Sequence, residues 1–215
     1  DQHWGFSGRG LYEEQRLFGK KDSLGRYKLG WKNQLSYEFV QSRFKAIAPY
    51  RNVEFARDWN IAPDALPEDE HLVNYNTELR KNTLGNVLYS LTWYQRGADY
   101  RANRNIVTLN YDRNYIKGGI VFNLMNSNSP FQKTAYFRPS AFLEKTFPKI
   151  LGITLGAKYQ KEHDEIRYAA TDTLMPTAFS FDILNVYLRN KEDSKTRLEP
   201  NYTLRRDDIV VNNAF

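Results

Sequence analysis

Residues 151–162, with the sequence LGITLGAKYQKE, alternate between apolar and polar side chains. One parity holds Leu151, Ile153, Leu155, Ala157 and Tyr159, and the other holds Gly152, Thr154, Gly156, Lys158 and Gln160. This period of two predicts a β-strand with one apolar and one polar face. The run is longer than the usual strand of about 5–6 residues. It matches the roughly 9–11 residues with which a tilted strand crosses a bilayer.

The same alternation recurs along most of the chain. It predicts about ten antiparallel strands, over residues 3–18, 26–40, 72–80, 84–96, 103–112, 115–125, 133–146, 151–162, 178–189 and 196–207. Residues 52–59 could form a further short strand, and residues 209–215 could begin another. No internal repeat, low-complexity segment or amphipathic helical period interrupts the pattern. The fold class is therefore predicted to be all-β, an antiparallel up-and-down transmembrane β-barrel in a single domain over residues 1–215.

The predicted connections alternate in length. The shorter set covers residues 19–25, 81–83, 113–114, 147–149 and 190–195, and the longer set covers residues 41–70, 97–102, 126–132 and 163–177. Alternate connections of a meander lie at opposite ends, and outer-membrane barrels have short periplasmic turns and long external loops. This expectation places residues 41–70, which contain Pro49, Pro63 and Pro67, in a long extracellular loop.

Composition excludes several classes of protein. The chain of 215 residues has no Cys, so disulfides, thiolate nucleophiles and cysteine metal sites are excluded. No apolar run has the length of a transmembrane helix. The formal charge is +6, but Lys and Arg are dispersed among Asp and Glu rather than clustered. This mixture favours a hydrated surface over a nucleic-acid partner.

Four stretches carry a resemblance to a known class, namely RYKLGWKNQLSYEF, NVLYSLTWYQ, GGIVFNLM and LGITLGAKYQ. Through them the chain resembles bacterial outer-membrane β-barrel proteins, and its dispersed Asn, Tyr and Arg are most similar to barrels of the Bacteroidota. The resemblance is one of pattern over nearly the whole chain. It implies an outer-membrane location with lipid and lipopolysaccharide as surroundings, and it carries no functional residues over.

The direction of the strands gives a further expectation. If the short turns are periplasmic, the first strand runs inward and the tenth runs outward, so both ends of this chain lie outside. A complete barrel normally has both termini in the periplasm. The chain is therefore expected to be a set of consecutive strands from a larger barrel.

The polar parity is expected to face a water-filled lumen, because a charge facing lipid near the midplane costs about 2–4 kcal/mol. Its charged members are Lys28, Lys32, Glu38, Arg138, Glu144, Lys158, Glu162, Arg197, Glu199 and Arg205. Their mixed signs predict a hydrated lumen or an internal salt-bridge lattice rather than a selective ion path. The apolar parity is expected to face lipid, with Trp93, Tyr111, Tyr159 and Tyr187 as aromatic residues at the interfaces.

No catalytic, cofactor or metal site is predicted. His3, His71 and His163 lack a partner at metal-ligand spacing, and surface positions near strand ends or in loops explain them better. His163-Asp164-Glu165 could hold a cation in a loop, and His163, Asp164 and Ser180 could contribute to a barrel enzyme, but solvated positions are the stronger explanation. Gly118-Gly119 lacks a phosphate-loop pattern.

The sequence therefore predicts an outer-membrane barrel that is a transport or secretion pore, or a component of a translocation or assembly complex. Other envelope proteins are expected to bind through its external loops. Two alternatives stay open, namely a soluble lipocalin-like barrel with the apolar parity inward, and a cell-surface or adhesin β domain that binds through its loops. The cargo, the total strand number and the oligomeric state do not follow from the sequence.

Overall fold

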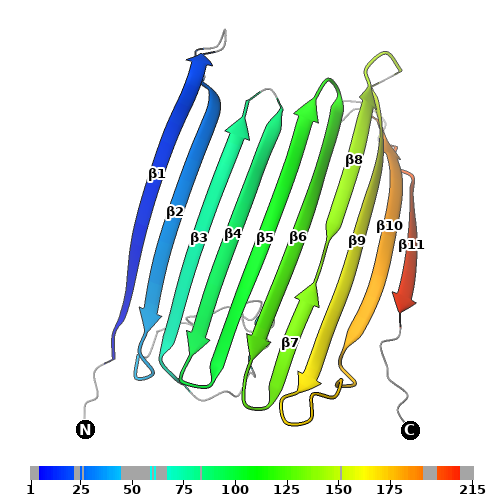
Figure 1. Ribbon diagram of the computed structural model, residues 1–215. Helices are drawn as coiled ribbons and strands as arrows, with labels where there is room; N and C mark the ends of the chain where they lie inside the picture. Colours follow the sequence, from blue (N-terminus) through cyan, green and yellow to red (C-terminus); the bar gives the residue numbers. More distant parts are fainter. Residues whose placement is uncertain are drawn as a thin grey trace.

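The computed structural model describes residues 5–21, 25, 27–44, 59, 61, 67–82, 84–150, 152–190 and 198–208. These residues form one antiparallel sheet (Figure 1). The strands are β1 (Ser7–Lys21), β2 (Tyr27–Val40), β3 (Glu70–Lys81), β4 (Gly85–Arg96), β5 (Tyr100–Arg113), β6 (Ile116–Asn128), β7 (Gln132–Phe137), β8 (Ser140–Phe147), β9 (Ile153–Tyr168), β10 (Phe179–Arg189) and β11 (Asn201–Asp208). No helix among the described residues is long and apolar enough to span a membrane.

The strand order follows the chain from β1 to β11, so the predicted antiparallel meander is confirmed. Strands β7 and β8 lie end to end between β6 and β9 and form one row, as the strand predicted at residues 133–146 requires. The break falls at Pro139, which has no N–H to donate. Pairing continues on both sides without a slip, because the Arg138 N–H donates to Asn123 O at 2.8 Å and Pro139 O accepts from the Lys161 N–H at 2.9 Å.

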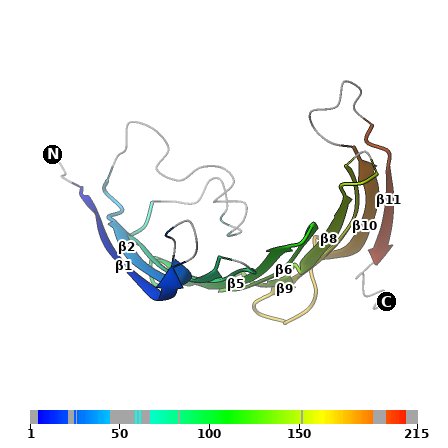
Figure 2. The same cartoon turned by 90° about the horizontal axis from the view of Figure 1, so that it is seen from above.

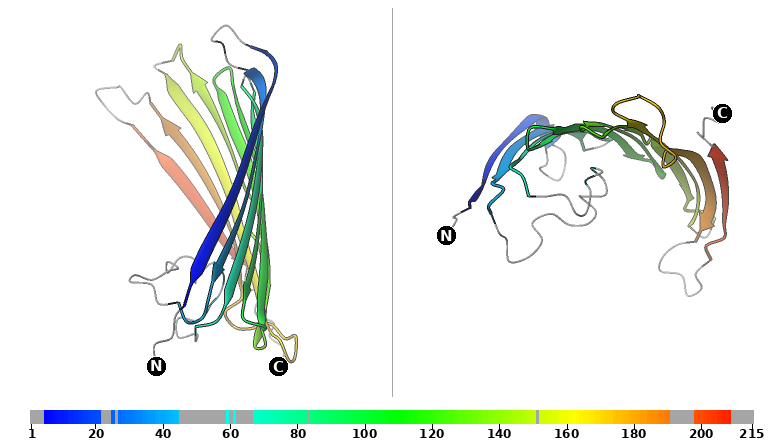
Figure 3. Two further views of the ribbon diagram at one scale, coloured as in Figure 1. Left: turned by 90° about the vertical axis from the view of Figure 1, so that its left-hand side faces the viewer. Right: turned by 90° about the horizontal axis from the view of Figure 1, so that it is seen from below.

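The sheet is curved into a shallow trough (Figure 2) and is twisted, so that β1 and β11 point in different directions when the sheet is seen from its β1 edge (Figure 3). Its concave face carries Tyr94, Met125 and Tyr136, and its convex face carries Leu109, Ile120 and Tyr159. Within the described residues β1 and β11 are the two edges of the sheet, and they do not pair with each other.

The predicted alternation of short and long connections is wrong. At the upper end of Figure 1 the connections are residues 22–26, 82–84, 114–115, 148–152 and 190–200, and at the lower end they are 41–69, 97–99, 129–131 and 169–178. The lower connections 97–99 and 129–131 are as short as the upper one at 82–84. Polar strand ends such as Arg101 and Asn126 caused the error, because their composition is typical of loops although they pair in register.

The predicted loop at 163–177 is also shorter than expected, because β9 continues to Tyr168. The turn expected at 113–114 is a two-residue turn of Asn114 and Tyr115, which both have positive φ, as a tight hairpin requires. The possible strand at 209–215 lies outside the described residues, as does the one at 52–59 except for Trp59, which lies in a turn.

Register places the predicted faces of most strands correctly. Val87 pairs with Leu109, which pairs with Ile120, and this apolar row continues through Ala141, Tyr159 and Leu184 on the convex face. For β10 the face predicted for Tyr187 is wrong. Tyr187 pairs with Gly156 of the polar parity on the concave face, as Phe181 and Ile183 pair with Glu162 and Gln160, and the convex residues of β10 are Leu184, Val186 and Leu188.

Candidate functional site

Polar side chains cover most of the concave face and contact one another across the strands. Asn74 bridges two neighbours, because its Nδ2 donates to Ser36 Oγ at 3.4 Å and its Oδ1 accepts from Thr92 Oγ1 at 2.9 Å. Towards the upper end, Asn86 donates to Glu78 Oε1 at 2.8 Å. Cross-strand hydrogen bonds of this kind satisfy polar groups without a packed apolar layer. This part of the trough is thus a polar surface rather than a hydrophobic core.

A charged cluster occupies this face over β7, β9 and the break after β7. The Arg138 guanidinium donates to both carboxylate oxygens of Asp164, from Nε at 3.1 Å and from Nη2 at 2.6 Å. Its Nε also lies 3.9 Å from Glu162 Oε2. The same guanidinium lies 4.2 Å from the centroid of the Tyr136 ring. A bidentate pair stacked on an aromatic ring fixes the position of Arg138, since the fork geometry allows only one orientation.

A second cluster joins β8 to β10 nearer the upper end. Tyr187 donates its hydroxyl to Glu144 Oε1 at 2.5 Å, and Arg189 Nη2 donates to Glu144 Oε2 at 2.9 Å. Tyr187 was expected to face lipid, but it lies on the concave face because β10 has the opposite parity. The other predicted interfacial residues, Trp93, Tyr111 and Tyr159, lie on the convex face.

The predicted lumen-facing charges share the concave parity wherever they lie in a strand. These residues are Lys28, Lys32, Glu38, Arg138, Glu144, Lys158, Glu162 and Arg205. Glu199 lies before β11, and Arg197 lies outside the described residues. Charges of both signs alternate across the strands, which produces paired clusters rather than a field of one sign.

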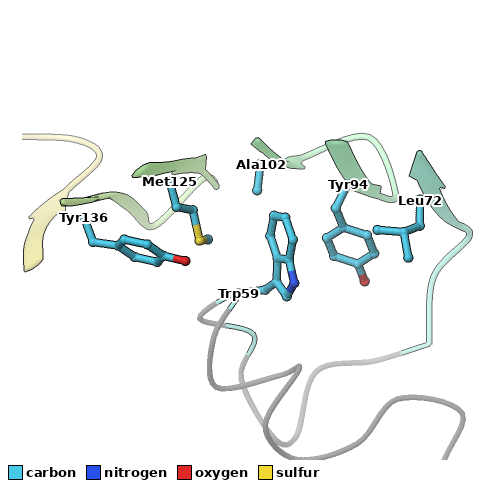
Figure 4. Close-up of a cluster of buried hydrophobic side chains, with 6 residues drawn as sticks. All are labelled: Trp59, Leu72, Tyr94, Ala102, Met125 and Tyr136. Atoms are coloured by element: carbon cyan, nitrogen blue, oxygen red, sulfur yellow. The ribbon is translucent and has the colours of Figure 1, made fainter. Parts of the chain in front are cut away.

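An aromatic cluster at the lower end of the concave face is the most buried part of the described chain. Its members are Trp59, Leu72, Tyr94, Ala102, Met125 and Tyr136. Figure 4 shows Trp59 pointing at the sheet between Tyr94 and Met125. The Trp59 and Tyr94 rings are 5.6 Å apart, and Tyr94 is fully buried. Tyr100 donates its hydroxyl to the main-chain oxygen of Trp59.

This cluster adds to the expectation for residues 41–70. They were predicted to form a long external loop, and Trp59 and Ile61 of this segment pack against the concave face of the sheet. Sequence reasoning missed the cluster because Trp59 lies far along the chain from its partners. A signal was available, since Leu72, Tyr94, Ala102, Met125 and Tyr136 are apolar or aromatic residues at polar-parity positions near one end of neighbouring strands.

The base of this segment is fixed by Asp69. Its Oδ1 accepts from the Ser42 N–H at 2.7 Å, and its main-chain oxygen accepts from the Gly97 N–H at 2.8 Å. The hydrogen bonds from Ser42 lower the pKa of the Asp69 carboxyl below its ordinary value of 3.8. Asp69 is therefore ionised at neutral pH and holds together the two ends of segment 41–69.

The histidine and serine candidates do not form a catalytic site. Asp164 faces Arg138 on the concave side, whereas His163 pairs with Ser180 and lies on the other face. His163 also lies in β9 rather than in a loop, and its Nε2 is 3.2 Å from Glu165 Oε1. His71 Nδ1 is 2.8 Å from the Tyr37 hydroxyl. Among the described residues there is no group of three or more His, Asp or Glu side chains that could hold a metal ion. His3 lies outside these residues.

Comparisons with known proteins give no match. No family model matches the chain, and neither the curated proteins nor the solved structures contain a significant relative.

Proposed function

We propose that the chain contributes consecutive strands to an outer-membrane β-barrel, with the convex face towards lipid and the concave face towards a water-filled lumen. The barrel serves as a transport or secretion pore, or as part of a translocation or assembly complex. The two free edges of the sheet are where the remaining strands of a larger barrel pair. The observation that carries this proposal is the exposure of large apolar side chains on the convex face.

Large apolar side chains are exposed over the whole width of that face. Leu143, Leu155 and Leu184 are 60%, 48% and 41% exposed, and similar residues continue the surface in every strand from β3 to β11. A water-soluble monomer rarely exposes a contiguous apolar patch larger than a few hundred Å². A bilayer removes the cost of this exposure, because the lipid chains are as apolar as the side chains.

The apolar band also crosses the strands at an angle. In β4 the convex apolar residues are Val87–Trp93, which are centred on residue 90. The pairing between successive strands places residue 90 in the same row as Glu162 of β9. In β9 the corresponding residues are Ile153–Tyr159, centred about six residues nearer the upper end. With about 3.3 Å per residue and about 4.8 Å between strands, a shift of about six residues over four strand spacings corresponds to about 45°.

This slope supports the membrane assignment, because barrel strands tilt by roughly 35–45° from the membrane normal. The planar hydrocarbon layer of a bilayer would then cross the rows of paired residues obliquely. In β9–β11 the apolar band lies nearer the upper end, and polar groups occupy the convex face below it. Lys161 pairs with Asp182 at 3.6 Å and with Asp208 at 3.9 Å on the convex face of β9–β11, below the apolar residues.

Trp59 and Ile61 of segment 41–69 give the proposed lumen a second component, because both pack against the concave face. Side chains in this position narrow the lumen and limit what passes. The external loops remain the proposed contact for other envelope proteins.

The lipocalin-like alternative is disfavoured by the direction of curvature. That architecture puts the apolar parity on the concave side, around a small ligand. Here the concave side carries Arg138, Asp164 and Glu144, and the apolar parity is convex.

A pair of arginine substitutions in β5 tests the proposal. Leu109→Arg puts a charge in the middle of the convex band, and Thr108→Arg puts the same charge on the concave face. Insertion into phosphatidylcholine vesicles, measured by flotation and protease protection, is expected to fall for Leu109→Arg by the equivalent of about 2–4 kcal/mol. Thr108→Arg is expected to insert like the unchanged protein. Equal insertion of both variants, or a protein that stays monomeric without detergent, would overturn the proposal.

A further inference from the structure

A groove interrupts the convex face near its upper end. Its volume is about 840 Å³. The small residues that open it are Gly85 on β4, Gly118 on β6, Ala141 on β8 and Ala157 on β9, which lie in two neighbouring rows of paired residues. Larger side chains such as Tyr111, Leu143 and Tyr159 stand around them. The groove is therefore a local absence of side-chain volume within an otherwise bulky apolar band.

The lining of the groove is almost entirely hydrocarbon. Leucine, isoleucine and alanine side chains supply most of it, and Lys81 is the one lining residue with a charge among those described. The volume falls within the roughly 300–1,000 Å³ of small-molecule sites. An elongated apolar ligand with few polar atoms fits such a lining, because it leaves no buried polar group without a partner.

Three cations border the groove at the upper end of the same face. Lys81, Arg113 and Lys145 all have convex parity and exposed side chains. Arg113 and Lys145 flank Ile116 in one row, so their backbones are two strand spacings apart, about 10 Å. Lys145 Nζ lies 5.2 Å from the Phe147 ring centroid. Among the described strand residues no Asp or Glu shares this face at this level, and none of the ion pairs described there involves these three residues.

We propose that the groove binds one anionic phospholipid, with its acyl chains along Gly118, Ala141 and Ala157 and its phosphate group between Lys81, Arg113 and Lys145. The inference rests on the proposed membrane location. Charge complementarity selects this occupant, because an apolar helix or a neutral lipid would leave the three cations unused. One phospholipid also matches the groove volume better than the several chains of lipid A.

Native mass spectrometry of the full chain in a neutral detergent tests this inference. The probes are dioleoyl phosphatidylglycerol and dioleoyl phosphatidylcholine, added separately at equal concentrations. A single phosphatidylglycerol adduct is expected at a concentration at least about tenfold lower than for phosphatidylcholine, since each basic residue strengthens binding to anionic lipid. The triple variant Lys81→Ala/Arg113→Ala/Lys145→Ala is expected to lose this preference. A matched control, Lys28→Ala/Lys32→Ala/Lys158→Ala, removes three cations from the concave face and is expected to keep it.

A second pair of variants tests the groove itself. Ala141→Trp fills it, whereas Ala135→Trp adds the same side chain to the convex face outside it. Loss of the phosphatidylglycerol adduct is expected only for Ala141→Trp. Equal binding of the two lipids to the unchanged protein, or an adduct that survives Ala141→Trp, would overturn the inference. Tighter binding of lipid A than of phosphatidylglycerol would also overturn it.

Flotation with vesicles of pure phosphatidylcholine separates the two proposals. Insertion into these vesicles needs no anionic headgroup. A protein that inserts but shows no lipid preference removes the phospholipid site alone, and a protein that does not insert removes the membrane location as well.

Discussion

Arg138 is the side chain that connects the charged and aromatic clusters of the concave face. Its guanidinium holds Asp164, whose side chain is only 8% exposed, and stacks on Tyr136, which is also a member of the Trp59 cluster. Arg104 approaches the same ring, at 5.8 Å from its centroid. Tyr136 thus links the charged cluster to the aromatic one, and a change at Arg138 is expected to reach both.

Replacing Arg138 with Met is expected to lower the free energy of unfolding by about 1–3 kcal/mol, because Asp164 keeps its charge without its bidentate partner. Urea unfolding of the protein in detergent micelles measures this loss. The double variant Arg138→Met/Asp164→Leu is expected to recover at least half of it, because no unpaired carboxylate remains. A double variant whose loss equals the sum of both single losses would show that the pair is not coupled.

Asp69 predicts a pH dependence for the base of segment 41–69. Since its folded pKa is below its ordinary value of 3.8, its contribution to stability is fully present above that value and is lost as the pH falls through the folded pKa. Hydrogen exchange of the Ser42 amide, corrected for its intrinsic rate, is expected to be slower at pH 6 than at pH 3. Asp69→Asn is expected to abolish this difference, and a difference that persists in the Asn variant would assign it to another group.

At the scale of elements, regular alternation predicted the strands well, and errors fell where alternation was ambiguous. In β10 both parities contain apolar residues, with Phe181 and Ile183 on one and Leu184 and Val186 on the other. Only the pairing with β9 decides which set faces outward. The polar ends of β5 and β6 were predicted as loops, because outside the apolar band a strand has no facial contrast to mark it. Backbone pairing, which composition does not report, extends these strands.

Segment 41–69 could be located from the sequence, but the packing of Trp59 on the concave face could not. Trp59→Ala is expected to remove this attachment of the segment to the sheet, since truncating a buried Trp costs about 3–5 kcal/mol. Cleavage between residues 44 and 67 in limited proteolysis is expected to become at least about tenfold faster, because 1.4 kcal/mol already corresponds to tenfold. Trp93→Ala removes a Trp from the convex face and serves as the matched control. Unchanged cleavage in Trp59→Ala would mean that the cluster does not hold the segment.

For the whole molecule, the order of the described strands was predictable because each pairs with its neighbours in sequence, with β7 and β8 together forming one row between β6 and β9. The curvature was not, since a flat sheet and a trough have the same alternation. The direction of curvature decides which face is concave, and the polar concave face favours the proposed membrane barrel over the lipocalin-like alternative. The slope of the apolar band likewise emerges only when the registers of successive strands are combined.

The strictly sequential pairing has a consequence for how such a sheet changes during evolution. Because no strand crosses over another, a hairpin such as β4–β5 could be duplicated or deleted while every remaining strand keeps a neighbour of the same direction. The width of the sheet can therefore grow or shrink in steps of two strands, each through a single genetic event. In a barrel built from such hairpins, the number of hairpins would set the circumference. Evolution could then change the internal diameter without altering the existing strands.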